Sequence, residues 1–290
     1  MRGVVMPVVL ALAAAVATLP AMARGAQSPA PPSQTGASRL VLAAATDPRN
    51  RPLVDLGPDD FVIEEGKDER EVLSVHPADY PIVVLLGTGV EAHADFATIQ
   101  TAVLHFIERL GDERPIALVS FGGAPRLIAS FEDDRKTVLA RLQALSIDAA
   151  PGREVLRGAG LAAETLRATQ TLFSAIVVVS GTPIDAARGT DEDTLGPIIE
   201  SGAILHVVAN FGNAAAAPGT LRGLVEQTHG VYTPVYTAAS FQPALDRLAD
   251  RLSTELIVEY LVPAGSKASD VRVGVRIPGA RVRGLGVAPR

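Results

Sequence analysis

The sequence contains no cysteine, and aromatic residues make up only 4% of its 290 residues. The lack of cysteine excludes disulfides, thiol chemistry, lipid attachment through cysteine, and metal or cluster sites built on thiolates. Basic residues are also few, because 26 Lys and Arg face 32 Asp and Glu, which gives a formal net charge of −6. The basic residues form no block, so we expect no nucleic-acid partner.

The first 23 residues have the pattern of an export signal. Arg2 precedes an uncharged run rich in Ala, Val and Leu, residues 3–23, which ends in an A-x-A cleavage pattern. We expect a signal peptide over 1–23 that is removed, and hence a periplasmic or extracellular protein that meets the membrane only during export. The run is close to the roughly 18 to 20 residues of a spanning helix, so a retained anchor is the alternative. Residues 24–37, rich in Pro and Ser, are expected to form a flexible linker.

Beyond the linker, the hydrophobic pattern changes twice. Residues 38–78 contain short β-type runs separated by turn signals, with no helical period between them. Residues 79–253 alternate strands with helices, and residues 254–290 return to β-type runs. This order predicts an α/β fold with a doubly wound, mostly parallel sheet. We expect the segments 38–78 and 254–290 to pack together as a small β subdomain.

The strands of the α/β part are expected at continuous apolar runs, which are typical of parallel strands buried on both faces. These runs lie at 82–86, 116–121, 175–180 and 204–209. A short hairpin partner is expected at 126–130. The helical period predicts helices at 96–110, 135–145, 156–169, 193–201, 221–228 and 241–253.

The turn after the first α/β strand, "GTGVEA" at 87–92, fits the G-x-G-x-x-A pattern of dinucleotide-binding proteins. Such a site also needs an Asp or Glu at the end of the second strand to hold the ribose hydroxyls. The second strand here ends in "ALVSFGG", which carries no carboxylate. We therefore expect no nucleotide and no other cofactor.

Candidate catalytic groups are scattered along the chain. Ser180 and Thr182 follow a strand, but the sequence has no G-x-S-x-G motif and no paired-histidine metal motif. His206 lies inside an apolar strand, where a hydrogen-bonded core histidine is expected, and His229 stands at a helix end, where capping explains it. The acidic run 132–134 precedes a helix and suits its N-terminal dipole. We expect a protein without enzymatic activity.

Several segments follow one another along the chain in a specific order, among them "NRPLVDLGPDDFVIEEG", "PIVVLLGTGVEAH", "SAIVVVSGTPID" and "LRGLVEQTHGVYTPV". The ordered set resembles the von Willebrand factor A-related proteins that bacteria secrete, over most of residues 38–288. "PIVVLLGTGVEAH" stands where that family has its first strand, and "SAIVVVSGTPID" stands where it has its fourth. The resemblance implies a von Willebrand factor A-like α/β domain, which often carries a metal-ion-dependent adhesion site at the strand ends.

That metal site uses D-x-S-x-S after the first strand, a Thr from a second loop and an Asp from a third, which hold Mg²⁺ through oxygens and water. The matching positions here are Gly87, Gly89, Glu91, Glu154 and Gly181. Both aspartates are replaced by glycine and the hydroxyls are missing, so the resemblance implies a degenerate site, and we expect no bound metal. A rearranged site that uses Glu91 and Glu154, with Asp95 or Asp185, is the alternative.

The loops beyond the carboxyl ends of the strands are the expected binding crevice of an open α/β sheet, with or without a metal. Their candidate contact residues are Thr88, Asp95, Arg153, Thr182 and Asp185. The sequence thus predicts an exported, non-enzymatic protein of the interaction or adhesion type with an unknown protein partner. Two alternatives stay open: an exported metal-dependent adhesin or hydrolase that uses Glu91 and Glu154, and a structural envelope spacer.

Overall fold

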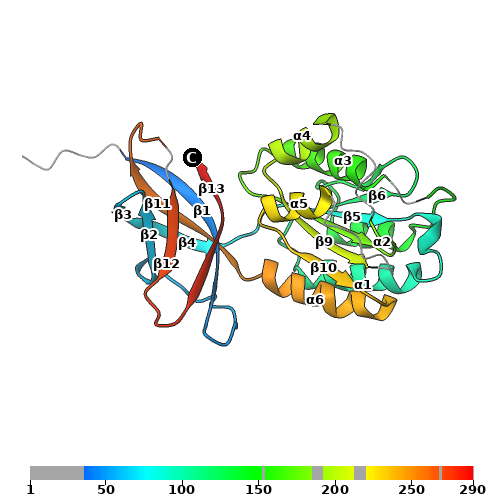
Figure 1. The fold of residues 1–290 in the computed structure, drawn as a ribbon, viewed down its shortest axis with the longest axis horizontal. Coiled ribbons are helices and arrows are strands. Elements are labelled where there is room, and N and C mark those ends of the chain that lie inside the picture. The colour runs from blue at the N-terminus through cyan, green and yellow to red at the C-terminus, as the bar shows by residue number, and fades with distance from the viewer. Residues whose placement is uncertain (1–35, 152–153, 185–191, 212–219, 268–269, 290) are drawn as a thin grey trace, which may run out of the picture. The chain divides into compact units, whose positions relative to one another are not determined.

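The structure, a computed structural model, describes residues 36–289 apart from 152–153, 185–191, 212–219 and 268–269 (Figure 1). The predicted signal peptide and nearly all of the predicted linker lie outside the described residues, as do Arg153 and Asp185. No helix in the described part of the chain is long and apolar enough to cross a membrane.

The α/β part is built on a six-stranded sheet with the strand order β10-β9-β8-β5-β6-β7. Its strands are β5 (Ile82–Gly87), β6 (Ile116–Phe121), β7 (Arg126–Ala129), β8 (Ala175–Ser180), β9 (Ile204–Asn210) and β10 (Tyr232–Val235). Neighbouring strands are parallel except for β6 and β7, which are antiparallel. Every residue of β5, β6 and β8 is buried, as the continuous apolar runs predict for strands covered on both faces.

Helices cover both faces of this sheet (Figure 1). Their bounds are α1 (Phe96–Arg109), α2 (Arg135–Gln143), α3 (Val155–Arg167), α4 (Glu192–Glu200), α5 (Thr220–Gln227) and α6 (Phe241–Leu252). Alternate strand residues point to opposite faces of a sheet. Val84 and Leu86 therefore share a core with α1, α2 and α6, whereas Val83 and Leu85 share one with α3, α4 and α5.

The remaining strands form two antiparallel sheets, with the orders β13-β1-β11-β4 and β12-β2-β3. Their bounds are β1 (Gly36–Thr46), β2 (Phe61–Glu65), β3 (Asp68–Arg70), β4 (Val72–Pro77), β11 (Glu255–Pro263), β12 (Val271–Val275) and β13 (Arg281–Pro289). β1 pairs with β11 and β13, and β2 pairs with β12, so strands from the two ends of the described chain lie side by side. Val41, Phe61 and Tyr260 belong to a core that the two sheets share. Leu42, which points the other way, belongs to a core of the α/β part.

The predicted fold class is confirmed: the chain has an α/β domain with a largely parallel sheet and additional small antiparallel sheets. Two strands, β3 and β10, were not predicted. Each is short, and β10 contains Pro234, which lacks the N–H that a central strand would donate; β10 accordingly lies at an edge of its sheet. The helix bounds differ from the predicted ones by a few residues at most, since helix ends depend on local hydrogen bonds that the apolar period does not report.

Candidate functional site

The predicted site begins where β5 ends, in the loops that follow the parallel strands; we call this side of the sheet the carboxyl edge. Gly87 is the last residue of β5 and pairs with Phe121 of β6, and Gly89 precedes a 3-10 turn at Val90–Ala92. Gly87, Thr88 and Gly89 are buried, whereas Glu91 is exposed. The turn thus lies at the strand ends, with its glycines facing inward.

Apolar side chains occupy the space next to Gly87 and Gly181. A Cβ atom at Gly87 would lie 3.0 Å from Cζ of Phe121, and one at Gly181 would lie 2.6 Å from Cδ1 of Ile99 in α1. Both neighbours are fully buried core residues. An aspartate at either position would have to displace a packed side chain, which typically costs roughly 1–3 kcal/mol. The structure therefore uses these two glycines for close packing.

A hydrogen-bonded carboxylate closes the loop over the glycines. Thr88 Oγ1 donates to Oδ2 of Asp148 over 2.7 Å, and Nη2 of Arg126 donates to Oδ1 of the same carboxylate over 3.1 Å. The backbone N–H of Asp148 donates in turn to the carbonyl of Thr88 over 2.7 Å. A Cβ atom at Gly122 would lie 2.6 Å from both the Thr88 hydroxyl and the Asp148 carboxylate, so this close approach requires glycine. The Thr88 hydroxyl is thereby engaged within the fold.

Asp148 and Arg126 were not among the predicted site residues. Asp148 lies between α2 and α3 and is the one carboxylate in the segment 144–151. The structure buries the Thr88 hydroxyl, which therefore needs a hydrogen-bond partner, but this burial was not predicted from the sequence. The sequence does not reveal which of the loop carboxylates supplies that partner.

Of the other predicted residues, Glu154 and Thr182 make local contacts. Glu154 Oε2 pairs with Nη1 of Arg157 over 3.2 Å within the first turn of α3. Asp95 precedes α1 without capping it through its side chain. The hydroxyl of Ser180 donates to the carbonyl of Thr182 over 2.9 Å, which closes a tight turn after β8.

The structure brings part of the predicted metal site together. A Cβ atom at Gly87 would lie 3.4 Å from Oγ of Ser180, the residue before Gly181, so the turns after β5 and β8 are neighbours. Glu154 is paired with Arg157, a residue of its own helix. Within the described ranges, no group of three or more His, Asp or Glu side chains could hold a metal ion.

These residues do not fit a Mg²⁺ ion. Magnesium is held mainly by carboxylate oxygens in near-octahedral geometry. Gly87, Gly89 and Gly181 supply no side-chain oxygen, and the hydroxyl of Thr88 donates to Asp148. The nearby carboxylate of Asp148 is itself neutralised by the guanidinium group of Arg126.

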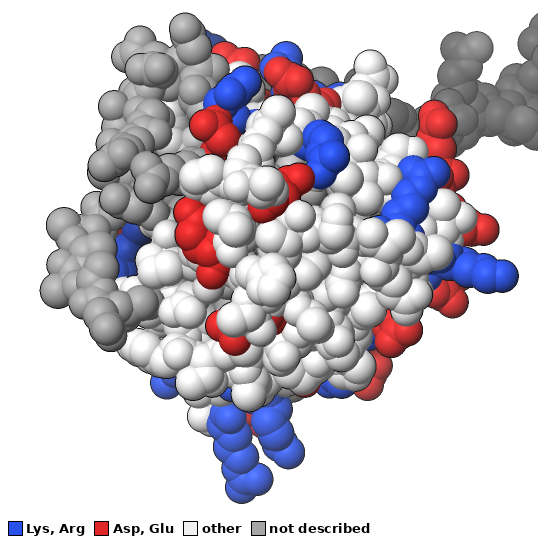
Figure 2. All heavy atoms as spheres, turned by 90° about the vertical axis from the view of Figure 1, so that its right-hand side faces the viewer, with Lys and Arg blue, Asp and Glu red and all other residues white. Residues whose placement is uncertain are grey.

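Much of the surface that the described residues form at the carboxyl edge carries neither acidic nor basic side chains, with Glu91 an exposed exception. Figure 2 views the α/β part from the right-hand side of Figure 1, where the loops after the strands lie, and shows a broad uncharged area between scattered charges. Val90 is 44% exposed in this region, and Ala124 and Ala149 are exposed as well. We call the surface formed by the turns after β5, β6 and β8 and by the segment 148–151 the carboxyl-edge face.

Two predicted structural roles away from this face are confirmed. His206 is 1% exposed and its Nδ1 accepts the N–H of Val231 over 3.2 Å. Burial, together with the positive charge of Arg251, lowers the pKa of His206 to about 3, so the side chain is a neutral core histidine. Asp134 is the N-cap of α2 and accepts the N–H of Thr137 over 2.7 Å, and hydrogen bonding by Thr137 lowers the pKa of this carboxyl.

The amino ends of the same strands, which we call the amino edge, hold a buried polar cluster that the sequence did not predict. The Tyr80 hydroxyl donates to the carboxylate of Glu255, and the guanidinium of Arg114 lies 5.1 Å from the centre of the Tyr80 ring. Arg114 Nη2 also donates to the carbonyls of Ala78 and Leu252, over 2.6 and 3.1 Å. Burial raises the pKa of Glu255 and raises that of Tyr80 well above its usual value.

No known protein family and no curated protein matches the sequence. Solved structures share its fold, among them a von Willebrand factor type A protein from Catenulispora acidiphila. That protein is 9% identical, superposes with a TM-score of 0.52, and is matched over 88% of this chain and 74% of its own. The PilB minor pilin from Streptococcus sanguinis is 10% identical with a TM-score of 0.46, over 62% of this chain and 62% of the pilin. The vWF domain of the type V pili tip protein Mfa5 from Porphyromonas gingivalis is 11% identical with a TM-score of 0.45, over 60% of this chain and 95% of that domain.

The similarity to the Catenulispora protein concerns the fold, since few residues are shared. The α/β part of the chain accordingly has a von Willebrand factor A-like fold, as the resemblance in sequence implied. The chain spans less than two thirds of the length of the PilB pilin.

Proposed function

We propose that the chain is an exported, non-enzymatic protein that binds another protein through its carboxyl-edge face without a metal ion. The observation that carries this proposal is the packing at Gly87 and Gly181, where Phe121 and Ile99 fill the space that metal-binding aspartates would need. A binding face that has lost its ion can still act through shape and apolar contact, because loops beyond the strand ends of an open α/β sheet form a natural crevice.

The chemistry of the carboxyl-edge face supports a protein partner. The cores of protein–protein interfaces are depleted in charged residues, and Figure 2 shows a broad uncharged area on this side. The bonds from Thr88 and Arg126 to Asp148 hold the loop in one conformation, so little ordering is required when a partner binds. Export is supported by the signal-like pattern of residues 1–23.

Metal independence is tested by equilibrium dialysis of the purified protein against Mg²⁺, Mn²⁺ and Ca²⁺. We expect no stoichiometric binding of any of the three ions. Stoichiometric binding that Glu91→Ala and Glu154→Ala abolish would instead favour a rearranged metal site, and with it the metal-dependent adhesin or hydrolase.

The use of the carboxyl-edge face is tested by placing a charge in it. Val90→Glu adds a carboxylate to the uncharged area, and Leu73→Glu on β4 is a matched control because the two side chains are 44% and 42% exposed. In cross-linking to the native cell envelope, we expect Val90→Glu to lose a partner that the wild type and Leu73→Glu both capture. If no reproducible partner is captured by any of the three proteins, the structural spacer becomes the better explanation.

A further inference from the structure

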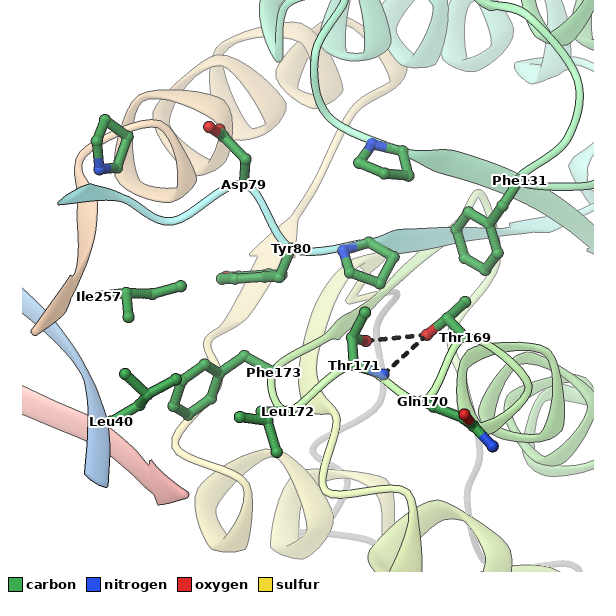
Figure 3. A pocket seen from close by; sticks show the side chains of 13 residues that line it. Leu40, Asp79, Tyr80, Phe131, Thr169, Gln170, Thr171, Leu172, Phe173 and Ile257 are labelled. Atoms are coloured by element: carbon green, nitrogen blue, oxygen red, sulfur yellow. Dashed lines mark hydrogen bonds between the residues drawn. The ribbon is translucent and has the colours of Figure 1, made fainter. Parts of the chain in front are cut away.

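A pocket of about 650 Å³ opens at the amino edge of the six-stranded sheet, on the side opposite the carboxyl-edge face. Pro81 and Pro115 immediately precede β5 and β6, and Phe173 shortly precedes β8, so these lining residues mark the amino ends of three parallel strands. Leu40 of β1 and Ile257 of β11 line the other end of the pocket (Figure 3). Its volume lies within the roughly 300–1,000 Å³ of sites that bind small molecules, which often occur where subdomains meet.

The lining favours an uncharged, apolar ligand. Tyr80 and Phe173 lie between the aliphatic end and a second end at Phe131 and two threonines (Figure 3). Among the described residues that line the pocket, none is Lys or Arg, and Asp79 is the one that carries a charge. An anionic ligand would therefore lack a counter-charge in the lining and would face a carboxylate.

The aromatic wall is held in place before any ligand arrives. Tyr80 is fixed by its hydrogen bond to Glu255 and by the guanidinium of Arg114 over its ring. Arg114 is anchored in turn to the carbonyls of Ala78 and Leu252. A pocket with a preformed wall binds without the cost of ordering its side chains.

The threonines at the second end define the polar contact. Thr169 Oγ1 donates to the carbonyl of Leu166 over 2.7 Å, so in its 2.9 Å contact with Thr171 Oγ1 it is the acceptor. The hydroxyl of Thr171 therefore donates to Thr169, and its own oxygen keeps acceptor capacity for an N–H or O–H group. The ligand should thus carry a hydrogen-bond donor at this end.

We propose that this pocket binds an uncharged, mainly apolar small molecule whose body lies against Tyr80 and Phe173 and whose N–H or O–H group donates to Thr171. The site is separate from the proposed protein-binding face, because it lies at the other edge of the sheet. It requires neither a metal nor a partner protein.

The test uses N-phenylnaphthylamine, an uncharged dye with two aromatic groups and one N–H, whose fluorescence rises in apolar surroundings. Its sulfonated analogue, anilinonaphthalene sulfonate, has the same rings and an added negative charge. Titration of the full chain should show saturable one-to-one binding of the uncharged dye, and the sulfonated dye should bind at least about tenfold more weakly. Equal binding of the two dyes, or no saturable binding of the uncharged one, would overturn the proposal.

Substitutions in the lining then test whether the dye binds in this pocket. Leu172→Glu places a charge at the rim and should weaken binding at least about tenfold, whereas Ile199→Glu on α4 should leave binding unchanged; the two side chains are 49% and 45% exposed. Thr171→Val keeps the shape and removes the acceptor, and should weaken binding about fivefold, as expected for one neutral hydrogen bond. Thermal unfolding of each variant verifies that it is folded. Equal losses in Leu172→Glu and Ile199→Glu, or an unchanged affinity in Leu172→Glu, would refute the assignment.

Discussion

At the carboxyl edge of the six-stranded sheet, buried glycines pack against Phe121 and Ile99, whereas at the amino edge buried charged groups contact Tyr80, which lines a pocket. The resemblance in sequence pointed to the carboxyl edge, because that is where the family places its metal ligands. The larger accumulation of polar chemistry lies at the other edge, at Tyr80, Arg114 and Glu255. A motif thus indicates where a fold can place functional residues, whereas the contacts show where this chain places its buried polar groups.

The two edges differ in their packing because different connections between elements begin and end there. At the carboxyl edge, Gly87 at the end of β5 and Gly181 directly after β8 let the backbone approach neighbouring side chains closely. At the amino edge, β4 leads into β5 and α6 leads into β11, so backbone carbonyls such as those of Ala78 and Leu252 are buried between elements. Buried carbonyls need donors, and Arg114 satisfies two of them with one nitrogen.

The largest expected effect is on stability, when alanine replaces a glycine at the amino edge. The same replacement at the carboxyl edge should cost less. A Cβ atom at Gly230 would lie 1.7 Å from the carbonyl oxygen of Leu205, at the start of β9, so the backbone itself would have to move. We expect Gly230→Ala to cost more than about 3 kcal/mol of unfolding free energy, above the usual range for overpacking. Gly87→Ala at the carboxyl edge should cost only about 1 kcal/mol, because its nearest neighbour is the tip of a side chain.

Urea unfolding measures both changes, and Gly223→Ala in α5 is the control. Nothing lies within 4 Å of a Cβ atom at Gly223, so alanine there should be neutral or stabilise by up to about 1 kcal/mol through helix propensity. Equal losses of unfolding free energy in Gly230→Ala and Gly87→Ala would contradict the difference in packing between the two edges.

The next effect is a pH dependence that originates in the amino-terminal half of β9. The pKa of His206 is lowered to about 3 in the folded chain, so below pH 6.5 the unfolded chain binds a proton that the folded chain does not. Stability from this residue is complete above pH 6.5 and is lost as the pH falls toward 3, by about 1.4 kcal/mol per pH unit. Between pH 7 and pH 5, the wild type should therefore lose about 2 kcal/mol through His206.

Two substitutions separate the titration of His206 from its hydrogen bond. His206→Asn keeps an acceptor for the N–H of Val231 and removes the titration, so its loss between pH 7 and pH 5 should be smaller by about 2 kcal/mol. His206→Leu should remove the same pH dependence and also lower stability at pH 7 by about 1–3 kcal/mol, because it leaves the N–H without a partner. Urea unfolding at the two pH values gives both quantities, and a wild-type pH dependence in His206→Asn would contradict the assignment.

The fold was predictable because its signals are local and repeated. Strands β5, β6, β8 and β9 are continuous apolar runs, and the helical period marks the buried sides of α1 and α6. Strand β10 was missed because four residues that include Pro234 carry no such signal.

The site was less predictable because its contacts join residues far apart in the sequence. Thr88 and Asp148 are 60 positions apart, and Tyr80 and Glu255 are 175 apart, and neither pair has a spacing that a motif could reveal. Arg39 and Glu65 form another buried ion pair that the sequence does not reveal, because the two residues are 26 positions apart and Glu65 follows another glutamate, Glu64. The packing beside Gly87 could not be predicted either. The sequence shows that a metal ligand is missing, but it does not show that the Phe121 side chain occupies the space.

The smallest predicted effect concerns the hydrogen bond that shapes the carboxyl-edge face. Thr88→Val keeps the volume of the buried side chain and removes its bond to Asp148, so we expect a loss of about 1 kcal/mol, with Thr88→Ser close to the wild type. The backbone N–H of Asp148 should exchange with solvent faster in Thr88→Val, because the bond that holds the two loops together is lost. Arg126 would still hold the other carboxylate oxygen, so the loop should loosen without unfolding. Unchanged exchange in Thr88→Val would mean that backbone packing alone orders this edge, and that its rigidity, unlike that of the amino edge, does not depend on polar side chains.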